Sequence, residues 1–222
     1  WDTGTKDSLM KKVAIIDYGL CNIKSITNAL EFLSIPYELT DSPRTFLAQD
    51  LAILPGVGAF SDGMKGLRDK DFVGAIAEFV ESGKPLLGIC LGMQMLMSVS
   101  YEFGEHEGLN LVAGEVLRFS EKRDVGNDAI KVPHIGWNGL KKASLSWDKT
   151  PLGGISEADS MYFVHSFYVS PAGPSAVLAE TDYEGTRFCS VLKSRNLYGC
   201  QFHPEKSGER GLMILRNFYN FG

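Results

Sequence analysis

Two short motifs, far apart in the chain, carry side chains that together could perform nucleophilic chemistry. Cys90 stands in Gly88-Ile89-Cys90-Leu91-Gly92, between the apolar residues 85–87 and the helix-like residues 91–99. A nucleophile flanked by small residues between a strand and a helix is the arrangement of the G-x-S-x-G elbow, with sulfur in place of oxygen. The glycines remove Cβ atoms that would crowd the thiol. The first N–H groups of the helix would point toward the group that the sulfur attacks.

The second motif, Gln201-Phe202-His203-Pro204-Glu205, supplies a base and a carboxylate. Proline disfavours helical backbone in the residue before it, so His203 is expected to be extended. Side chains two positions apart on an extended chain share a face, and Glu205 could then fix the tautomer of the imidazole and stabilise its charged form. A lone buried cysteine is usually a core residue. Paired with this motif, Cys90 is predicted to be the nucleophile, His203 its base and Glu205 the orienting carboxylate.

Strand and helix patterns alternate through the first half of the chain and predict a parallel sheet covered on both faces. Its active site would lie at the carboxyl ends of the strands. The expected strands are residues 13–16, 37–39 and 51–54 and the strand that ends at Cys90; helices follow from apolar residues spaced between 23 and 33 and between 72 and 80. The second half contains strand-like segments joined by Gly- or Asn-containing turns, at residues 162–169, 176–181, 188–193 and 197–202. An amphipathic helix over residues 212–219 closes the chain.

Composition indicates one compact domain and excludes several classes of protein. The chain has 222 residues, 44% of them hydrophobic, and a net charge of −5, which is unlike a nucleic-acid-binding protein. Its four cysteines form no C-x-x-C pair and are interpreted as reduced thiols. The longest apolar stretch, residues 85–99, is interrupted by Gln94 and is too short to span a bilayer. Residues 1–9 are polar and precede Met10, so we interpret them as a cloning remnant outside a single domain at 10–222.

The loop Pro55-Gly56-Val57-Gly58 follows a predicted buried strand, so its amides are expected at the same sheet edge as Cys90. A phosphate-binding loop would need a following Lys-Ser/Thr or the full dinucleotide spacing, and the sequence has neither. An ordinary glycine-rich turn is the plain alternative. Acyl transfer needs hydrogen-bond donors aimed at the developing alkoxide, and we therefore favour an oxyanion role for this loop.

Six stretches, taken in order, resemble those of class I (triad-type) glutamine amidotransferases, and most closely the glutaminase subunit of imidazole glycerol phosphate synthase from histidine biosynthesis. They extend from about residue 13 to the C-terminus. The matching stretches are Asp17-Tyr18-Gly19 with Asn22, residues 54–60, Gly88 to Gln94, residues 132–138, residues 162–166 and Gln201 to Ser207.

The resemblance implies a three-layer, flavodoxin-like α/β fold, whose largely parallel central sheet gains antiparallel strands in the C-terminal half. It implies hydrolysis of L-glutamine to glutamate and ammonia through a cysteinyl thioester, with no cofactor and no metal. The oxyanion donors would be the amide of Leu91 and an amide of the loop near Val57 or Gly58. Residues implied to bind glutamine are Gly56, Gln94, His165, Ser166 and Phe167.

The resemblance also implies a partner. Ammonia would pass to a separate (β/α)₈ cyclase subunit, in a cytoplasmic heterodimer without membrane or nucleic acid. There it would react with a phosphoribulosyl aminoimidazole carboxamide nucleotide to give imidazole glycerol phosphate. The candidate interface residues are Asn22, His134, Trp137 and Lys206.

Two departures keep alternatives open. Cys21 stands where the family usually has glycine, and residues 102–109 resemble a paralogous branch that supplies ammonia for amidation of surface-polysaccharide sugars. That branch would share the glutaminase chemistry and differ in the acceptor. A free-standing hydrolase of peptides or γ-glutamyl chains would also use Cys90 and His203, but without an ammonia-receiving partner. Val57 favours the histidine-pathway branch, because many other branches have glycine at this position.

Overall fold

The computed structural model describes residues 11–120 and 130–221. The predicted cloning remnant at 1–9 lies outside the described residues. Helices and strands alternate in the first half of the chain, as expected. The elements are β1 (Val13–Ile16), α1 (Ile23–Phe32), β2 (Tyr37–Thr40), α2 (Pro43–Leu47), β3 (Leu51–Leu54), α3 (Phe60–Asp69), α4 (Phe72–Glu81), β4 (Leu86–Ile89) and α5 (Leu91–Met95).

The second half is mostly strands, with a long closing helix. Its elements are β5 (Val99–Ser100), β6 (His106–Glu107), β7 (Gly114–Arg118), β8 (His134–Gly139), β9 (Lys141–Lys142), β10 (Ser160–His165), β11 (Phe167–Pro171), β12 (Val177–Tyr183), β13 (Thr186–Ser194), β14 (Leu197–Cys200) and α6 (Gly208–Phe221). Single 3₁₀ turns lie at Pro174–Ala176 and Pro204–Lys206.

One large sheet runs through the molecule in the order β2-β1-β3-β4-β14-β13-β11-β7-β5-β6, with β12 and β9 joined to it beside β13. The strands from β2 to β14 are all parallel. The pairs β14–β13, β13–β11 and β11–β7 are antiparallel, and β7 pairs in parallel with β5. β8 and β10 form a separate two-stranded antiparallel sheet. The predicted fold, a parallel sheet extended by antiparallel strands, is confirmed.

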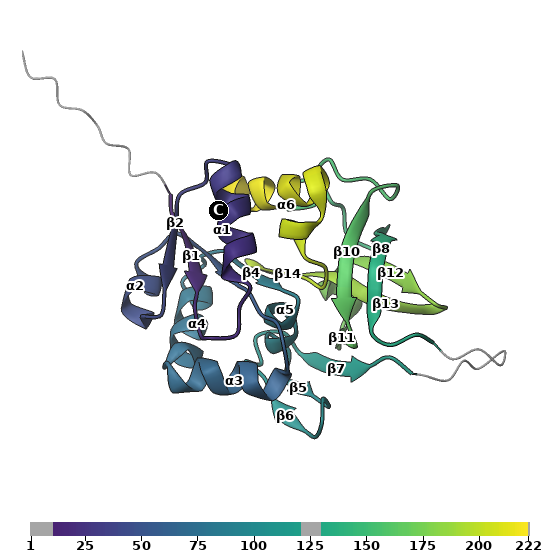
Figure 1. Cartoon of the computed structure of the whole chain (residues 1–222), viewed down its shortest axis with the longest axis horizontal. Coiled ribbons are helices and arrows are strands. Elements are labelled where there is room, and N and C mark those ends of the chain that lie inside the picture. Colours follow the sequence, from purple (N-terminus) through teal and green to yellow (C-terminus); the bar gives the residue numbers. More distant parts are fainter. Residues whose placement is uncertain (1–10, 121–129, 222) are drawn as a thin grey trace, which may run out of the picture.

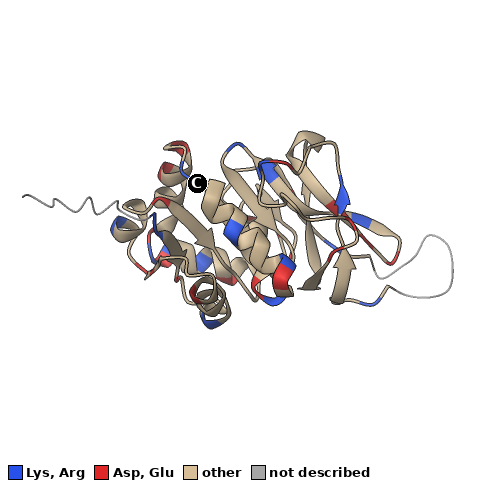
Figure 2. Cartoon of the chain, turned by 90° about the horizontal axis from the view of Figure 1, so that it is seen from above, with Lys and Arg blue, Asp and Glu red and all other residues tan. Residues whose placement is uncertain are grey.

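Helices cover both faces of the parallel strands, and Figure 1 shows α1 and α6 on one side and α3 and α4 on the other. Alternate residues of one strand enter different apolar clusters: Val13 and Ile15 of β1 pack with α1 and α6, while Ala14 and Ile16 pack with α3 and α4. A strand buried on both faces is continuously apolar, which is why β1, β3 and β4 have no polar side chain. Basic and acidic residues are interspersed along the elements (Figure 2).

Two predicted elements differ in the structure. The helix expected over residues 91–99 ends at Met95, and the chain then turns into β5. Backbone N–H groups of residues 109–112 donate hydrogen bonds to the carbonyls of Met95, Leu96 and Met97. These carbonyls therefore do not pair with a further turn of the helix, and the helix ends. The strand expected over residues 162–169 is two strands: β10 belongs to the small sheet and β11 to the large one, and Ser166 lies at the crossing. The described residues contain no helix long and apolar enough to cross a membrane.

Candidate active site

Cys90 occupies the sharp turn between β4 and α5 that its flanking glycines predict. Its backbone has φ 53° and ψ −109°, outside the usual regions for a residue with a side chain. Such a conformation costs about 1–3 kcal/mol and persists only where the surroundings impose it. Part of that restraint is visible, because Cys90 N–H donates to the Cys200 carbonyl at 2.8 Å. The strand β4 thereby presents the thiol at the carboxyl edge of the sheet.

The neighbouring glycines are required for close packing of α5 on the sheet. A Cβ at Gly92 would lie against the Leu54 carbonyl oxygen, and one at Gly88 would lie 2.7 Å from Met93 N. The atoms that exclude a side chain are therefore backbone atoms of β3 and α5. Close packing of α5 on the sheet is thus a reason for these glycines that the sequence interpretation did not include.

His203 and Glu205 form the predicted pair. His203 Nδ1 lies 2.8 Å from Glu205 Oε1, and the side chains are 3% and 1% exposed. His203 is extended as proline predicts, but Glu205 lies in the 3₁₀ turn Pro204–Lys206, so the turn and not an extended strand brings the two together. Ser207 donates from Oγ to the His203 carbonyl at 2.7 Å and holds this turn in place.

Opposing effects set the pKa of His203. Burial disfavours the charged imidazolium, but hydrogen bonds and charge interactions with Cys90 and Glu205 outweigh burial and raise the pKa of His203 to about 10. The surroundings of His203 therefore favour its charged imidazolium form at neutral pH. A thiolate is the reactive form of cysteine, and a neighbouring imidazolium is the kind of group that stabilises it.

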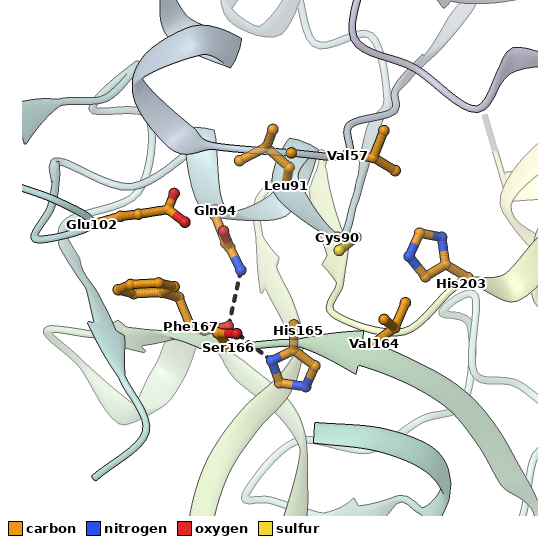
Figure 3. Close-up of a pocket in the computed structure, with 11 residues that line it drawn as sticks. Val57, Cys90, Leu91, Gln94, Glu102, Val164, His165, Ser166, Phe167 and His203 are labelled. Atoms are coloured by element: carbon orange, nitrogen blue, oxygen red, sulfur yellow. Dashed lines mark hydrogen bonds between the residues drawn. The ribbon is translucent and has the colours of Figure 1, made fainter. Parts of the chain in front are cut away.

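Cys90 and His203 face a cavity of about 320 Å³, large enough for one amino acid (Figure 3). Of the residues predicted to form the oxyanion hole or bind glutamine, all but Gly56 line it. Two further residues, Glu102 and Val164, complete the wall. Glu102 accepts a hydrogen bond from the Phe60 N–H, the first amide of α3, where the partial positive charge of a helix start favours a carboxylate.

Gln94 and Gln201 connect the cavity wall to the thiol. The amide nitrogen of Gln94 donates to the Phe167 carbonyl at 3.0 Å and to Gln201 Oε1 at 3.1 Å. Gln201 in turn directs its amide nitrogen to Cys90 Sγ at 3.7 Å. With its two N–H groups engaged, Gln94 has its amide oxygen left to offer a ligand.

The loop between β3 and α3 is fixed by two hydrogen bonds, one of which engages the Val57 amide. Val57 N–H donates to the Leu20 carbonyl at 3.1 Å, and Tyr18 Oη donates to the Pro55 carbonyl at 2.8 Å. In this conformation the Val57 amide is therefore engaged by Leu20, and of the two loop residues predicted as oxyanion donors Gly58 is the one without such a bond to Leu20. Leu91 N–H belongs to the first turn of α5, where a helix supplies no internal acceptor, and it stays the predicted donor together with Gly58.

Comparisons with known proteins agree with this geometry. The family model for class-I glutamine amidotransferases matches residues 14–220. The HisH 1 subunit of imidazole glycerol phosphate synthase from Legionella pneumophila (strain Paris) is 48% identical over 211 residues, covering 94% of this chain and 99% of that protein. The HisH subunit from Geobacter sulfurreducens is 42% identical over 209 residues, covering 94% and 98%. The chain belongs to the HisH family of class I glutamine amidotransferases.

Solved structures extend the fold comparison to more distant proteins. The structure of PurLQS from Thermotoga maritima has a TM-score of 0.70 at 22% identity and covers 96% of this chain and 99% of that one. A crystal structure described as a glutamine amidotransferase has a TM-score of 0.71 at 17% identity, covering 94% and 97%. The glutamine amidotransferase fold is therefore shared well beyond the range of close sequence similarity.

Two residues predicted for this glutamine amidotransferase site lie elsewhere. Gly56 does not line the cavity: a Cβ there would lie 2.5 Å from Tyr18 Oη and 2.8 Å from Leu91 Cβ, so its role is close packing beneath the loop. His134, expected at a partner interface, is fully buried and bonded to His165 and Asn138, so it contacts no partner directly. Trp137 is 56% exposed, Lys206 is exposed and Asn22 is half-buried.

The sequence interpretation assigned no role to Glu102, Gln201 or Tyr18. Gln201 stands two residues before His203 in the same motif, so its position was a usable signal. Glu102 contacts the start of α3 and Tyr18 contacts Pro55. These residues are far apart in sequence, so no local motif predicts the contacts. Within the described residues, no group of three or more His, Cys, Asp or Glu side chains is arranged to hold a metal.

The packing of Gly56 gives a first prediction. Gly56→Ala should lower stability by about 1–3 kcal/mol, because the added methyl overpacks Tyr18 and Leu91, and should shift the melting temperature by several degrees. Gly74→Ala in α4 is the matched control: a Cβ there meets nothing within 4 Å, and helix propensity should raise stability by about 0.5–1 kcal/mol. Thermal unfolding measures both. An unchanged melting temperature in Gly56→Ala with a raised KM for glutamine would show direct substrate contact instead.

The charge balance at His203 gives a second prediction. Glu205→Gln keeps the shape but loses the carboxylate that raises the pKa of His203, so this pKa should fall. Activity needs the protonated imidazole as acid, so the alkaline decline of kcat/KM, expected near pH 10 in the wild type, should move to lower pH. The rate at the optimum should fall by as much as about 10⁴-fold, as in other triads. A pH–rate profile identical to that of the wild type would leave a Cys-His dyad as the catalytic unit.

Proposed function

We propose that this chain is the glutaminase subunit of imidazole glycerol phosphate synthase and hydrolyses L-glutamine through a thioester on Cys90. The observation that carries the proposal is the meeting of Cys90, His203 and Glu205 at one amino-acid-sized cavity, in a chain of the HisH family. The relatives are named as synthase subunits, which supports a role in a complex.

In the first half-reaction, the Cys90 thiolate attacks the side-chain amide carbon of glutamine, and the carbonyl oxygen becomes an oxyanion. Leu91 N–H, at the positive end of α5, is placed to stabilise that charge. The His203 imidazolium gives its proton to the departing nitrogen, the C–N bond breaks, and ammonia and a γ-glutamyl thioester result. Glu205 stabilises the imidazolium and holds its tautomer through the 2.8 Å hydrogen bond.

In the second half-reaction, His203 is neutral and accepts a proton from water as the water attacks the thioester. The C–S bond breaks, glutamate leaves and the thiolate–imidazolium pair is restored. Gln201, which points its amide N–H groups toward Cys90 Sγ, stabilises the thiolate in both resting and departing states. The residues of this chain thus complete the cycle without a cofactor.

Glu102 and Gln94 bind the α-ammonium group of glutamine. Glu102 is the carboxylate among the cavity-lining residues, and burial raises its pKa, so an ammonium group beside it would restore its preference for the charged form. The free amide oxygen of Gln94 is a second acceptor for the same ammonium. Ser166 and Phe167 form the opposite wall, where backbone groups can hold the carboxylate (Figure 3).

The proposed partner is the (β/α)₈ cyclase subunit that takes up the ammonia, in the cytoplasm. Exposed apolar side chains beside the site support a protein contact there: Ile135 and Trp137 on β8 are each 56% exposed, and Val57 is 37% exposed. Trp137 packs beside Tyr162, whose carbonyl accepts the His203 N–H. This surface, with Lys206 and Asn22, adjoins the loop and the turn that carry the catalytic groups.

The chemistry of Cys90 gives a third prediction. Cys90→Ala should reduce glutamine hydrolysis to background, because no other thiol can take its place. Burial raises the pKa of Cys21 to about 11, and burial likewise raises the pKa values of Cys189 and Cys200, so all three stay protonated. A diazo-ketone analogue of glutamine should therefore label Cys90 alone, as peptide mass spectrometry can show. Labelling of another cysteine, with activity kept in Cys90→Ala, would refute the assignment.

The position of the Val57 amide gives a fourth prediction. Glutaminase activity of the isolated chain should be weak, because one expected oxyanion donor is bonded to Leu20. It should rise by about two orders of magnitude or more when the cyclase subunit and its nucleotide are added together, since loss of one oxyanion donor costs about 10²–10³-fold. The measurement is glutamate release from each component alone and combined.

Two results would contradict this proposal in different ways. Full activity of the isolated chain would favour a free-standing hydrolase. Stimulation by a sugar-modifying protein, and none by the cyclase, would favour the surface-polysaccharide branch. Either outcome leaves the thioester chemistry at Cys90 in place, because that chemistry is tested separately by labelling.

A further inference from the structure

Two buried histidines lie in line behind the glutamine wall of the cavity. His134 on β8 and His165 on β10 are directly opposite in the small antiparallel sheet, so their side chains point to the same face. His134 Nδ1 lies 3.0 Å from His165 Nε2, and His165 Nδ1 lies 2.8 Å from the Phe167 carbonyl oxygen. The catalytic steps use neither ring.

The segment that these histidines hold is the crossing between the two sheets. Ser166 lies where the chain leaves the small sheet and enters the large one, and one backbone hydrogen bond, from Phe119 N–H to the Ser166 carbonyl at 3.1 Å, holds it there. The bond from His165 to the Phe167 carbonyl spans this crossing (Figure 3). The same carbonyl accepts a second hydrogen bond from Gln94. One backbone oxygen therefore fixes the two sides of the proposed glutamine site relative to each other.

The order of donors along this line follows from simple proton counting. A carbonyl oxygen only accepts, so His165 donates from Nδ1, and as a neutral ring it must then accept at Nε2. His134 must donate to it from Nδ1 and accept at Nε2. The group beside His134 Nε2 is the amide of Asn138, with Oδ1 at 2.8 Å. If both rings are neutral, Asn138 must direct its NH₂ group at His134 Nε2. If Asn138 directs its oxygen at His134 Nε2, the two histidines must carry one more proton between them.

The surroundings favour neutral rings. Burial lowers the pKa of His134, and burial together with the charges of His134 and His203 lowers the pKa of His165 to about 3. His134 is also stacked between Tyr183 and Phe163, at ring-centre distances of 3.9 and 4.9 Å, which fixes the plane of its ring. Stacking against these two rings keeps Nδ1 aimed at His165 and Nε2 aimed at Asn138.

We propose that Asn138 and His134 are positioning residues, which act through His165 to fix the Phe167 carbonyl and with it the glutamine-binding wall. The proposal rests on the glutaminase function proposed above. Loss of this series of hydrogen bonds should loosen the Ser166–Phe167 wall and the Gln94 amide, which are proposed to bind the amino-acid end of the substrate. It should leave Cys90, His203 and Glu205 in place, because none of them is directly hydrogen-bonded to Asn138, His134, His165 or Phe167, and Cys90 is linked to the Phe167 carbonyl only indirectly, through Gln201 and Gln94. The expected signature is a raised KM for glutamine with kcat nearly unchanged.

His134 offers a pair of variants that separates hydrogen bonding from packing. The amide of His134→Asn keeps an N–H donor near the position of Nδ1 but leaves a space, whereas His134→Leu fills the space and has no donor. We expect the KM for glutamine to rise about tenfold in His134→Leu, as for one lost buried hydrogen bond, and to return most of the way in His134→Asn. If the role were packing alone, the order would be reversed, and that result would overturn the proposal.

Asn138→Asp tests the direction of the chain with an isosteric change. A carboxylate cannot donate, so this variant needs a third proton on the histidine pair. Its KM should be raised about tenfold at pH 8 and should recover toward the wild-type value at pH 6, whereas the wild type should change less than about twofold. Neighbouring groups do not titrate in this range: burial raises the pKa values of Tyr183 and Tyr168, the pKa of His203 is about 10, and hydrogen bonds from Arg187 and Lys141 hold the pKa of Asp182 at about 2.

Two controls keep failures distinguishable. Melting temperatures show whether each variant is folded at the assay temperature. Iodoacetamide lacks the α-amino and α-carboxyl groups of glutamine, so its rate of Cys90 alkylation should stay at the wild-type value. A wild type that does not hydrolyse glutamine refutes the proposed function. An active wild type with a KM unchanged in Asn138→Asp at both pH values refutes the positioning chain alone.

Discussion

The parallel pairing of β4 with β14 is the interaction on which the active site depends. These strands are far apart in sequence, and their register places Ile89 opposite Cys200, the last residues of both strands. The Cys90 N–H bond to the Cys200 carbonyl continues the ladder one step beyond. Parallel strands end at the same edge of a sheet, so the nucleophile turn and the Gln201–Glu205 motif leave the sheet side by side. A shift in this register would separate thiol from imidazole, whatever the local geometry of either motif.

The helix after Cys90 shows how tightly that edge is built. Three glycines, on β4, α5 and β14, let the helix lie directly on the sheet; a side chain at Gly199 would press on Met93, and those at Gly88 and Gly92 on backbone. The close approach imposes the strained turn at Cys90, and it aims the first amides of α5 at the cavity. Strain in the backbone and stabilisation of negative charge therefore have one cause, the short distance between helix and sheet.

The parts of this fold that were predictable are those set by local pattern. The strands β1, β3 and β4 are uninterrupted apolar runs, and Cys90, His203 and Glu205 sit in motifs whose spacing has a chemical meaning. The helix α3 was not expected, although Phe60, Met64 and Leu67 are helically spaced. Gly63 and Gly66 lower helix propensity there, and they are present because Met95, Leu91 and Tyr18 pack against them. The split at Ser166 was equally invisible, because apolar alternation continues from β10 into β11 although the two strands join different sheets.

The least predictable residues share one physical task, which is to hold backbone outside the strands or at the point where one sheet passes into another. The loop at residues 55–58 is bonded to the Leu20 carbonyl and to Tyr18, and the wall at Ser166–Phe167 is bonded through His165 to His134. In both places the holding group is close in sequence to a residue of the proposed partner surface: Asn22 follows Leu20 closely, and Ile135 follows His134. A protein docked on that surface would therefore reach both walls of the cavity through immediate neighbours. Control of glutamine hydrolysis by a partner then requires no long path through the core, because the hydrogen bonds that fix the cavity walls lie next to the proposed partner surface.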